Sequence, residues 1–174
     1  MILFAPSIDC GLSRVAAGGG TPAAVTTLDT ARGESGHFSP IFLPDGRQGI
    51  VGLIGGDGAG VYLASLDSTE RTLLVPGPVW PALTERGDLF YWLDSNLMAQ
   101  RLDVAGRRMV GDPVLVAENV VRIGPTPGMA VSPRGDVISD SFHTQGFFNR
   151  ESSLFKQVVP ASLTDRRELP AARE

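Results

Sequence analysis

The two histidines of this chain, His37 and His143, are its first candidates for acid–base chemistry. A histidine exchanges a proton near neutral pH, and a hydroxyl and a carboxylate beside it would complete a nucleophilic relay. Asp140, Ser141 and His143 have those residue types. Because they follow one another so closely along an expected strand, they cannot easily converge on one proton, and the sequence does not favour a relay there.

His37 directly precedes an expected strand, so a hydrogen bond that pins the strand edge is a better interpretation than general-base work. The segment Gly33-Glu34-Ser35-Gly36 lacks the second glycine of a nucleophile elbow and does not lie between a strand and a helix. The sequence therefore predicts no catalytic residue.

Cofactor and metal motifs are also missing from the sequence. The glycine loop Gly55-Gly56-Asp57-Gly58-Ala59-Gly60 has neither dinucleotide nor P-loop spacing and is expected to join two strands. The carboxylates Asp57, Asp67 and Asp94 are spread over different loops, and Cys10 is the only cysteine. We expect no bound cofactor and no metal site.

Two tripeptides, Arg86-Gly87-Asp88 and Arg134-Gly135-Asp136, have the letters of an adhesion motif. Both occupy the position of a turn glycine between apolar segments, where glycine supplies a positive φ and charged neighbours face solvent. The sequence therefore favours structural turns over an adhesion site at both tripeptides.

The elements that would position these residues are organised around the turn Pro44-Asp45-Gly46. Pro44 fixes φ at the second position of a tight turn, Asp45 can accept bonds from the following amides, and Gly46 can adopt positive φ. The flanking runs 37–43 and 49–54 are apolar or β-branched. This pattern predicts a β-hairpin.

The same unit recurs along the chain. Gly46 and Gly87 are separated by 41 residues, and Gly87 and Gly135 by 48, which is the period of a propeller blade. The segments 60–67 and 96–103 both end in Leu-Asp and follow their own hairpins. Four short strands per period, with no helical pattern between them, predict an all-β fold: an incomplete β-propeller of about three to four antiparallel, four-stranded blades.

The repeat also sets the expected boundaries. The nearly continuous apolar runs 49–54 and 89–93 predict strands buried on both faces, and Arg107 to Asp112 are expected to form a long turn. The blades are expected as a truncated first blade at 1–30, a second at 37–78, a third at 79–120 and the start of a fourth at 124–142, followed by a non-repeat tail at 143–174 that is disordered or a short helix.

The run 39–47 followed by 60–67 resembles the TolB-type, WD-like propeller repeat. More narrowly, the segments 2–6, 18–22 and 27–29 are similar to the propeller region that follows the kinase domain in certain large bacterial serine/threonine protein kinases. The resemblance covers residues 2–140. It implies a non-catalytic binding or sensor module for a protein, peptide or small molecule, from the extracytoplasmic part of such a kinase or a fragment of one.

The sequence itself has no glycine-rich nucleotide loop, no His-Arg-Asp loop and no Asp-Phe-Gly, so no kinase activity is expected. Two alternatives stay open: an accessory propeller of a prolyl-oligopeptidase-type serine peptidase, and a gene remnant without function. A neighbouring kinase domain would favour the first interpretation, and a neighbouring hydrolase domain with an intact nucleophile elbow would favour the peptidase.

Composition limits the possible partners. The net charge is −4 and no Lys/Arg cluster stands out, which argues against a nucleic-acid partner. No segment reaches the roughly 20 apolar residues needed to cross a bilayer, and the start is too short for a signal peptide. A protein or peptide partner is expected, together with self-association through open blade faces. The resemblance implies a periplasmic or extracytoplasmic location.

Overall fold

The computed structural model describes residues 1–77, 80–123, 126–127 and 129–139. In this part the chain is all-β, with antiparallel sheets and a single 3₁₀ turn, η1 (Thr30–Arg32), as its helical element. The expected all-β class is therefore confirmed. The expected tail at 143–174, with His143, lies outside the described residues, as do Asp140 and Ser141. No helix in the described ranges has the length and apolarity that a membrane span requires.

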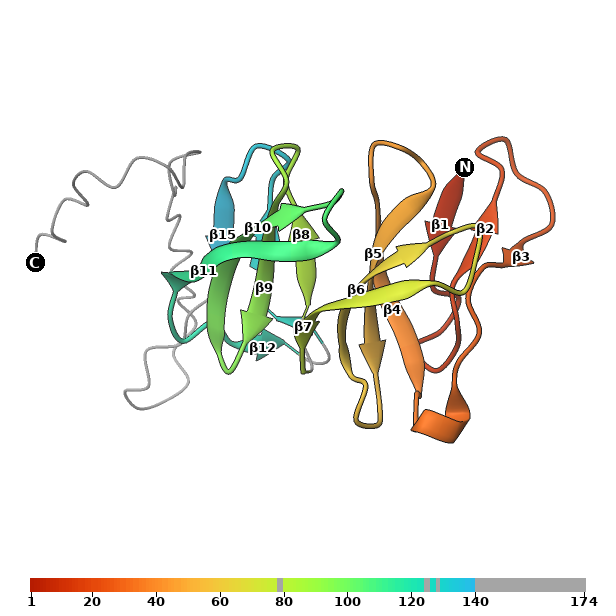
Figure 1. Cartoon of the computed structure of the whole chain (residues 1–174), viewed down its shortest axis with the longest axis horizontal. Coiled ribbons are helices and arrows are strands. Elements are labelled where there is room, and N and C mark those ends of the chain that lie inside the picture. Colours follow the sequence, from red (N-terminus) through yellow and green to blue (C-terminus); the bar gives the residue numbers. More distant parts are fainter. Residues whose placement is uncertain (78–79, 124–125, 128, 140–174) are drawn as a thin grey trace, which may run out of the picture.

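Two four-stranded sheets form the centre of the molecule (Figure 1). In both, each strand pairs with the next one along the chain, so that each sheet is a simple meander. The second sheet along the chain contains β4 (Gly36–Phe42), β5 (Gln48–Ile54), β6 (Gly60–Ser65) and β7 (Arg71–Pro76). The third sheet contains β8 (Pro81–Leu83), β9 (Asp88–Leu93), β10 (Asn96–Asp103) and β11 (Arg108–Ala117).

Smaller sheets lie on either side of these two. The first sheet along the chain has the order β1-β2-β3, and two hairpins follow the third sheet. The first sheet is built from β1 (Ile2–Phe4), β2 (Ser13–Val15) and β3 (Ala23–Ala24). The hairpins are β12 (Arg122–Ile123) with β13 (Thr126–Pro127), which the sequence did not indicate, and β14 (Met129–Val131) with β15 (Val137–Ser139).

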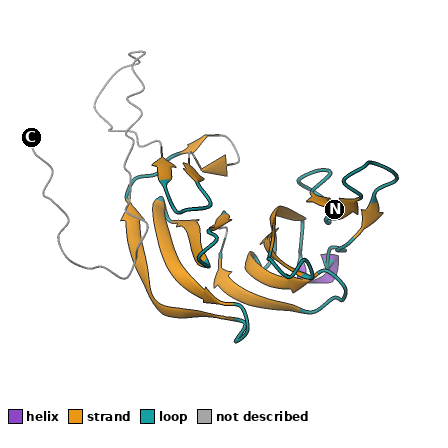
Figure 2. Ribbon diagram, turned by 90° about the horizontal axis from the view of Figure 1, so that it is seen from above, coloured by secondary structure: helices purple, strands orange, loops and turns teal. Residues whose placement is uncertain are grey.

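Seen from above, the sheets stand side by side along an open arc (Figure 2). Contacts follow the order of the chain: β1 packs on β4, β4 and β5 pack on β8, and β8 packs on β14. The two central sheets therefore each have a neighbouring sheet on both sides.

Three apolar cores fill the spaces between successive sheets. The first core joins Leu12 to residues of β5 and β6, the middle core joins the second and third sheets, and the last core joins the third sheet to Val120 and Val137. The cores contain Leu12, Val51, Leu53 and Ala64 (first); Leu43, Ile50, Val61, Leu63, Val75, Leu89, Tyr91 and Leu102 (middle); and Phe90, Trp92, Leu97, Ala99, Val120 and Val137 (last).

Strands β5 and β9 contribute to two cores each, as their continuous apolar runs predict. In β9, Leu89 and Tyr91 enter the middle core, whereas Phe90 and Trp92 enter the last core. Successive side chains of a strand point to opposite faces, so alternate residues reach different neighbouring sheets. Burial on both faces explains why neither strand shows the polar alternation of a sheet with one solvated face.

The turn at Asp45 and Gly46 has the bonds that its residue types favour. The Asp45 carboxylate accepts the backbone N–H groups of Gln48 (3.0 Å) and Arg47 (2.9 Å), and these bonds hold the pKa of Asp45 below its ordinary value. Gly46 has a φ of 66°. Gly87 and Gly135 also have positive φ, 85° and 97°, in the turns that precede β9 and β15.

Replacing Gly46 by Val is expected to destabilise the protein by about 1 kcal/mol or more, because a β-branched residue is strained at positive φ. No atom lies within 4 Å of a Cβ added at Gly46, so backbone strain alone carries the effect. Urea unfolding of both proteins measures it. Gly46→Asn is the matched control, since asparagine tolerates this region, and it should lose less. Equal midpoints for Gly46→Val and the parent would contradict the strained-turn assignment.

One expected turn is wrong. Arg107 to Asp112 were expected to form a long turn before the last strand, but β11 begins at Arg108 and pairs with β10 from Asp103↔Arg108 onward. The turn is the shorter segment 104–107, closed by a bond from the Arg107 N–H to the Val104 carbonyl. A register shift between Ala99 and Arg101 accommodates the glycine at 111 inside the strand.

Candidate functional site

The segment between β3 and β4 folds around a reciprocal pair of bonds. The Asp29 N–H donates to Oε2 of Glu34 (2.8 Å), and the Glu34 N–H donates back to the Asp29 carbonyl (3.1 Å). The Asp29 carboxylate also accepts the Arg32 N–H at the start of η1. This local fold carries Glu34 and His37 to the beginning of β4, on the side of the first sheet.

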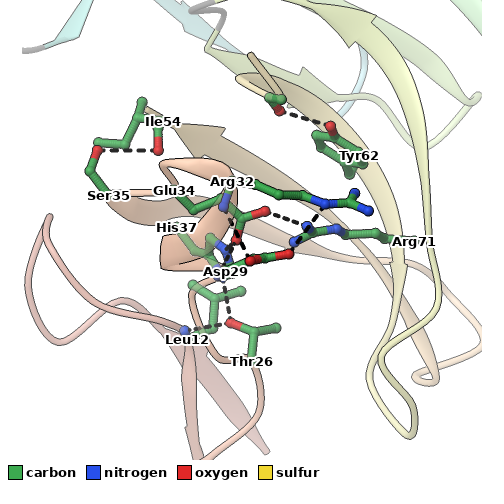
Figure 3. Close-up of polar contacts among 11 residues, drawn as sticks. Leu12, Thr26, Asp29, Arg32, Glu34, Ser35, His37, Ile54, Tyr62 and Arg71 are labelled. Carbon is green, nitrogen blue, oxygen red and sulfur yellow. Dashed lines mark hydrogen bonds and ion pairs between the residues drawn. The ribbon is translucent and has the colours of Figure 1, made fainter. Parts of the chain in front are cut away.

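Glu34 and His37 are the centre of a buried polar network (Figure 3). Their residues are only 5% and 2% exposed. Oε1 of Glu34 forms an ion pair with Nη2 of Arg71, which lies on β7, and Oε2 lies 3.3 Å from Nε2 of His37. Every oxygen of the buried carboxylate therefore has a hydrogen-bond donor, as a buried charge requires.

The imidazole of His37 connects this carboxylate to the first sheet. Its Nδ1 lies 2.7 Å from Oγ1 of Thr26, which in turn accepts the Leu12 N–H at 2.8 Å. The His37 N–H donates to the Cys10 carbonyl. A neutral imidazole protonated on Nε2 satisfies all of these contacts, since it donates to Glu34 and accepts from Thr26.

The loop before β2 lies directly across the start of β4. At Gly36 an added Cβ would be 1.7 Å from the Ile8 carbonyl oxygen, so only glycine allows this approach. The close contact brings the loop 8–12 and His37 together. The first and second sheets are thus joined by backbone contact as well as by the His37 network.

The electrostatics of the network fix its charge state at neutral pH. Burial raises the pKa of Glu34, but hydrogen bonds from Arg71, the Asp29 amide and His37 outweigh it and leave that pKa below its ordinary value. Burial lowers the pKa of His37, and the bond to Glu34 opposes this only in part. Glu34 is therefore ionised and His37 is neutral at pH 7.

The network has the residue types of a hydroxyl–imidazole–carboxylate relay. His37 could accept the proton of the Thr26 hydroxyl, and Glu34 would stabilise the imidazolium that forms. However, Oγ1 of Thr26 already accepts the Leu12 N–H, which draws electron density from the oxygen that would have to attack. The same bond holds Thr26 in place as a link between the first sheet and β4.

A pocket of about 540 Å³ opens beside this network, between the segment that follows the first sheet and the face of the second sheet. Its apolar floor is continuous with the first core, and its rim carries hydroxyl and charged groups. It is lined by Val25, Thr26, Thr27, Leu28, Asp29, Arg32, His37, Val51, Leu53, Ala64, Ser65, Ser68, Thr69 and Arg71. We call it the inter-sheet pocket.

A second pocket of about 280 Å³ lies beyond β4 and shares no lining residue with the first. Phe38 and Trp80 line it with their rings 4.7 Å apart, and Ser39 beside them has a φ of 46°. Its lining is mostly apolar and holds no charged residue.

The residues that the sequence singled out as repeat turns lie away from both pockets. Pro44, Asp45, Gly46, Gly87 and Gly135 line neither of them. Within the described ranges, His, Cys, Asp and Glu side chains form no group of three that could hold a metal ion.

Sequence reasoning placed a hydrogen bond on His37, and the structure shows it, but the partners were not foreseen. Glu34 stood in a segment discarded as a nucleophile elbow, and Arg71 follows it by 37 residues. The pairing of Glu34 with His37 could have been predicted from a carboxylate three residues before a histidine at the start of a strand. No neighbouring residue indicated that Arg71 would join them.

The network makes stability depend on pH. The pKa of His37 is lowered in the folded state. As the pH falls below about 6.5, the unfolded chain therefore binds a proton at His37 that the folded chain does not yet bind. The free energy of unfolding should fall as pH drops through this range, and the lowered pKa of Glu34 adds a loss in the same direction below about pH 4.3.

Urea midpoints at pH values on both sides of about 6.5 measure this dependence. The His37→Gln variant, which keeps a donor and an acceptor, should lose the part of the pH dependence that lies above about pH 5. A parent midpoint that stays constant or rises on acidification would contradict the neutral, buried histidine.

Comparisons of the chain with protein-family models, with curated proteins and with solved structures gave no match.

Proposed function

We propose that this chain is a non-catalytic binding module built from consecutive blades of a TolB-type β-propeller, and that the inter-sheet pocket holds its ligand. The observation that carries the proposal is the pocket itself. Its volume of about 540 Å³ lies within the range of roughly 300–1,000 Å³ that small-molecule sites occupy. An apolar floor with a few polar groups at the rim is the composition such sites share.

Two features of the sheets support the propeller part of the proposal. Each central sheet is a four-stranded antiparallel meander, and apolar cores lie between successive sheets. The sheets also stand along an arc (Figure 2), and their contacts follow the order of the chain. Sheets arranged radially with shared faces are the unit of a propeller. The blades would then be 1–30, 37–78, 79–120 and 124–142, with the turn glycines Gly46, Gly87 and Gly135 as their repeat marks.

The non-catalytic part rests on the bonding of Thr26, whose Oγ1 already accepts the Leu12 N–H. Thr26, His37 and Glu34 then act as a structural tie that shapes the pocket wall. The resemblance of residues 2–140 to kinase-associated propellers favours a sensor of a bacterial signalling kinase as the cellular role. A kinase domain and a membrane span encoded in the same protein would test that role.

Binding can be tested by thermal unfolding of the full chain with a library of small neutral, acidic and basic compounds. A compound present at tenfold excess over its Kd should raise the free energy of unfolding by about 1.4 kcal/mol. The Ser65→Phe variant places a ring in the pocket and should abolish the effect. The matched control is Ala105→Phe, in an exposed turn of the third sheet, which should keep it.

Two results would overturn the proposal. One is a library in which no compound stabilises the chain. The other is stabilisation that Ser65→Phe and Ala105→Phe retain equally, because the ligand would then lie outside the inter-sheet pocket.

A further inference from the structure

We infer that the ligand of the inter-sheet pocket carries a carboxylate on an apolar body, and that Arg71 binds this carboxylate. The inference rests on the proposed binding function and names the chemistry of its ligand. It is argued from the charges that line the pocket, from the hydrogen-bond donors left at its rim and from the nature of its floor.

The charges that line the pocket favour an anion. Arg32 and Arg71 are lining residues, and Asp29 is the single acidic one. Glu34, the partner of Arg71, is not part of the lining, because it is buried behind the guanidinium. Each of these arginines has an acidic partner, Glu34 for Arg71 and Asp29 for Arg32, so the group of four is formally neutral. The pocket nevertheless presents two guanidinium groups and only one carboxylate to a ligand, and guanidinium donors bind anions by charge-assisted hydrogen bonds.

Arg71 is positioned for a second carboxylate. Its Nη2 is bound to Glu34, whereas Nε and Nη1 make no hydrogen bond to the part of the chain that the structure describes. The guanidinium lies over the Tyr62 ring, with its carbon 5.4 Å from the ring centre, so two contacts hold it in place. Each bidentate fork of a guanidinium combines Nη2 with either Nε or Nη1, and Nη2 has a second N–H besides the one that donates to Glu34. One fork of Arg71 therefore remains for a carboxylate, and the two contacts hold it in position.

The rim around Arg71 is also rich in donors. The Ser65 and Ser68 hydroxyls accept backbone N–H groups of Asp67 and Glu70, which leaves their O–H groups to donate. Both serines line the pocket. A group with several acceptor oxygens and no hydrogen to donate matches this rim.

The floor specifies the rest of the ligand. Val51, Leu53 and Ala64 belong to the first core and also line the pocket. A hydrocarbon chain or an apolar side chain laid on them would extend the core between the sheets, and the burial of its apolar surface would strengthen binding. A free fatty or aryl acid and the C-terminal carboxylate of a peptide both have this chemistry.

The test uses the full chain and measures Kd by NMR at low salt for defined probes. Hexanoate is the acidic probe and hexanol its uncharged counterpart. The peptide N-acetyl-Ala-Val-Leu is compared as free acid and as amide. Hexanoate should bind about tenfold more tightly than hexanol, and the peptide acid likewise than its amide, because a charge-assisted bond is gained. Whichever acid binds more tightly identifies the source of the carboxylate.

Two variants assign the effect to Arg71. Arg71→Lys keeps a charge beside Glu34 but loses the planar fork, and it should weaken hexanoate binding by about tenfold. Thr69→Glu adds a negative charge at the exposed rim without touching the Glu34 network and should weaken it by about threefold. Ala105→Glu adds the same charge to a turn of the third sheet and should change nothing.

Equal binding of hexanoate and hexanol would overturn the carboxylate inference and leave the binding function in place. Hexanoate binding that Arg71→Lys and Thr69→Glu leave unchanged would overturn the role of Arg71. If neither hexanoate nor the peptide acid binds, but a library compound still stabilises the chain and Ser65→Phe abolishes that stabilisation, the carboxylate inference is wrong and the binding function stands. Failure of both acids and of the whole library would overturn the proposed function with it.

Discussion

Replacing Arg71 by Met is expected to destabilise the protein by about 3–5 kcal/mol, because it leaves a buried carboxylate without its counter-charge. Glu34 is only 5% exposed, and the Asp29 N–H donates to its Oε2, so the carboxylate is held away from water. The Asp29 N–H and His37 would remain as its donors, and neither is charged at pH 7. Urea unfolding at neutral pH gives the free energy directly.

The matched control is the double variant Glu34→Gln/Arg71→Met. Removing both charges together eliminates the uncompensated ion, so the double variant should be more stable than Arg71→Met alone. A single variant that loses less than about 1 kcal/mol would place Glu34 in contact with water. A double variant less stable than the single one would show that the carboxylate is held by groups other than Arg71.

The second large effect is expected at Trp92, whose replacement by Ala should cost about 3–5 kcal/mol. The side chain lies in the last core with Phe90 and Val137, and its indole Nε1–H donates to the Val120 carbonyl at 2.9 Å. Truncation to Ala removes this hydrogen bond. It also removes the packing of the Trp92 ring between the third sheet and the segments that follow it.

The Trp92→Phe variant separates the two contributions. It keeps most of the apolar area and loses the N–H donor, so a smaller loss of about 1 kcal/mol is expected. The measurement is the urea midpoint and slope of the three proteins. A loss below about 1 kcal/mol for Trp92→Ala would mean that this face of β9 is not buried against another sheet.

The strands and turns were largely predictable because their signals are local. Pro44, Asp45 and Gly46 specify a reversal through their own φ preferences and through bonds within four residues. The double-sided burial of β9 could also be read from the uninterrupted run Leu89–Leu93. In both cases the chemistry that decides the structure lies inside the segment that shows the pattern.

The inter-sheet pocket was not predictable from the same sequence, because its parts are joined only by folding. Glu34, His37 and Arg71 come from a loop, from β4 and from β7, and the pairing of these strands through β5 and β6 brings them together. Thr26 carries no sequence signal at all. The turn expected at Arg107–Asp112 failed for a related reason, since pairing with β10 extended the strand over a glycine that favours turns.

The buried network gives the pocket a defined wall. A charge that is fully paired in a protein interior adds little net stability but penalises other arrangements of the same groups. The Glu34–His37 pair binds two side chains of the pocket wall: His37 contacts Thr26, in the segment after β3, and Glu34 contacts Arg71 on β7. The position of the guanidinium at the rim is thus set before any ligand arrives, which lowers the entropic cost of binding.

The most direct test of the binding-module account is the amide NMR spectrum of the full chain titrated with the compounds that stabilise it. The account predicts that the signals of residues 25–32 and 65–71, which border the inter-sheet pocket from opposite sides, shift together and saturate at one Kd. Signals of the turns at Gly46 and Gly87 should stay in place. Saturable shifts confined to residues outside the pocket, or no saturable shift with any compound, would contradict the account.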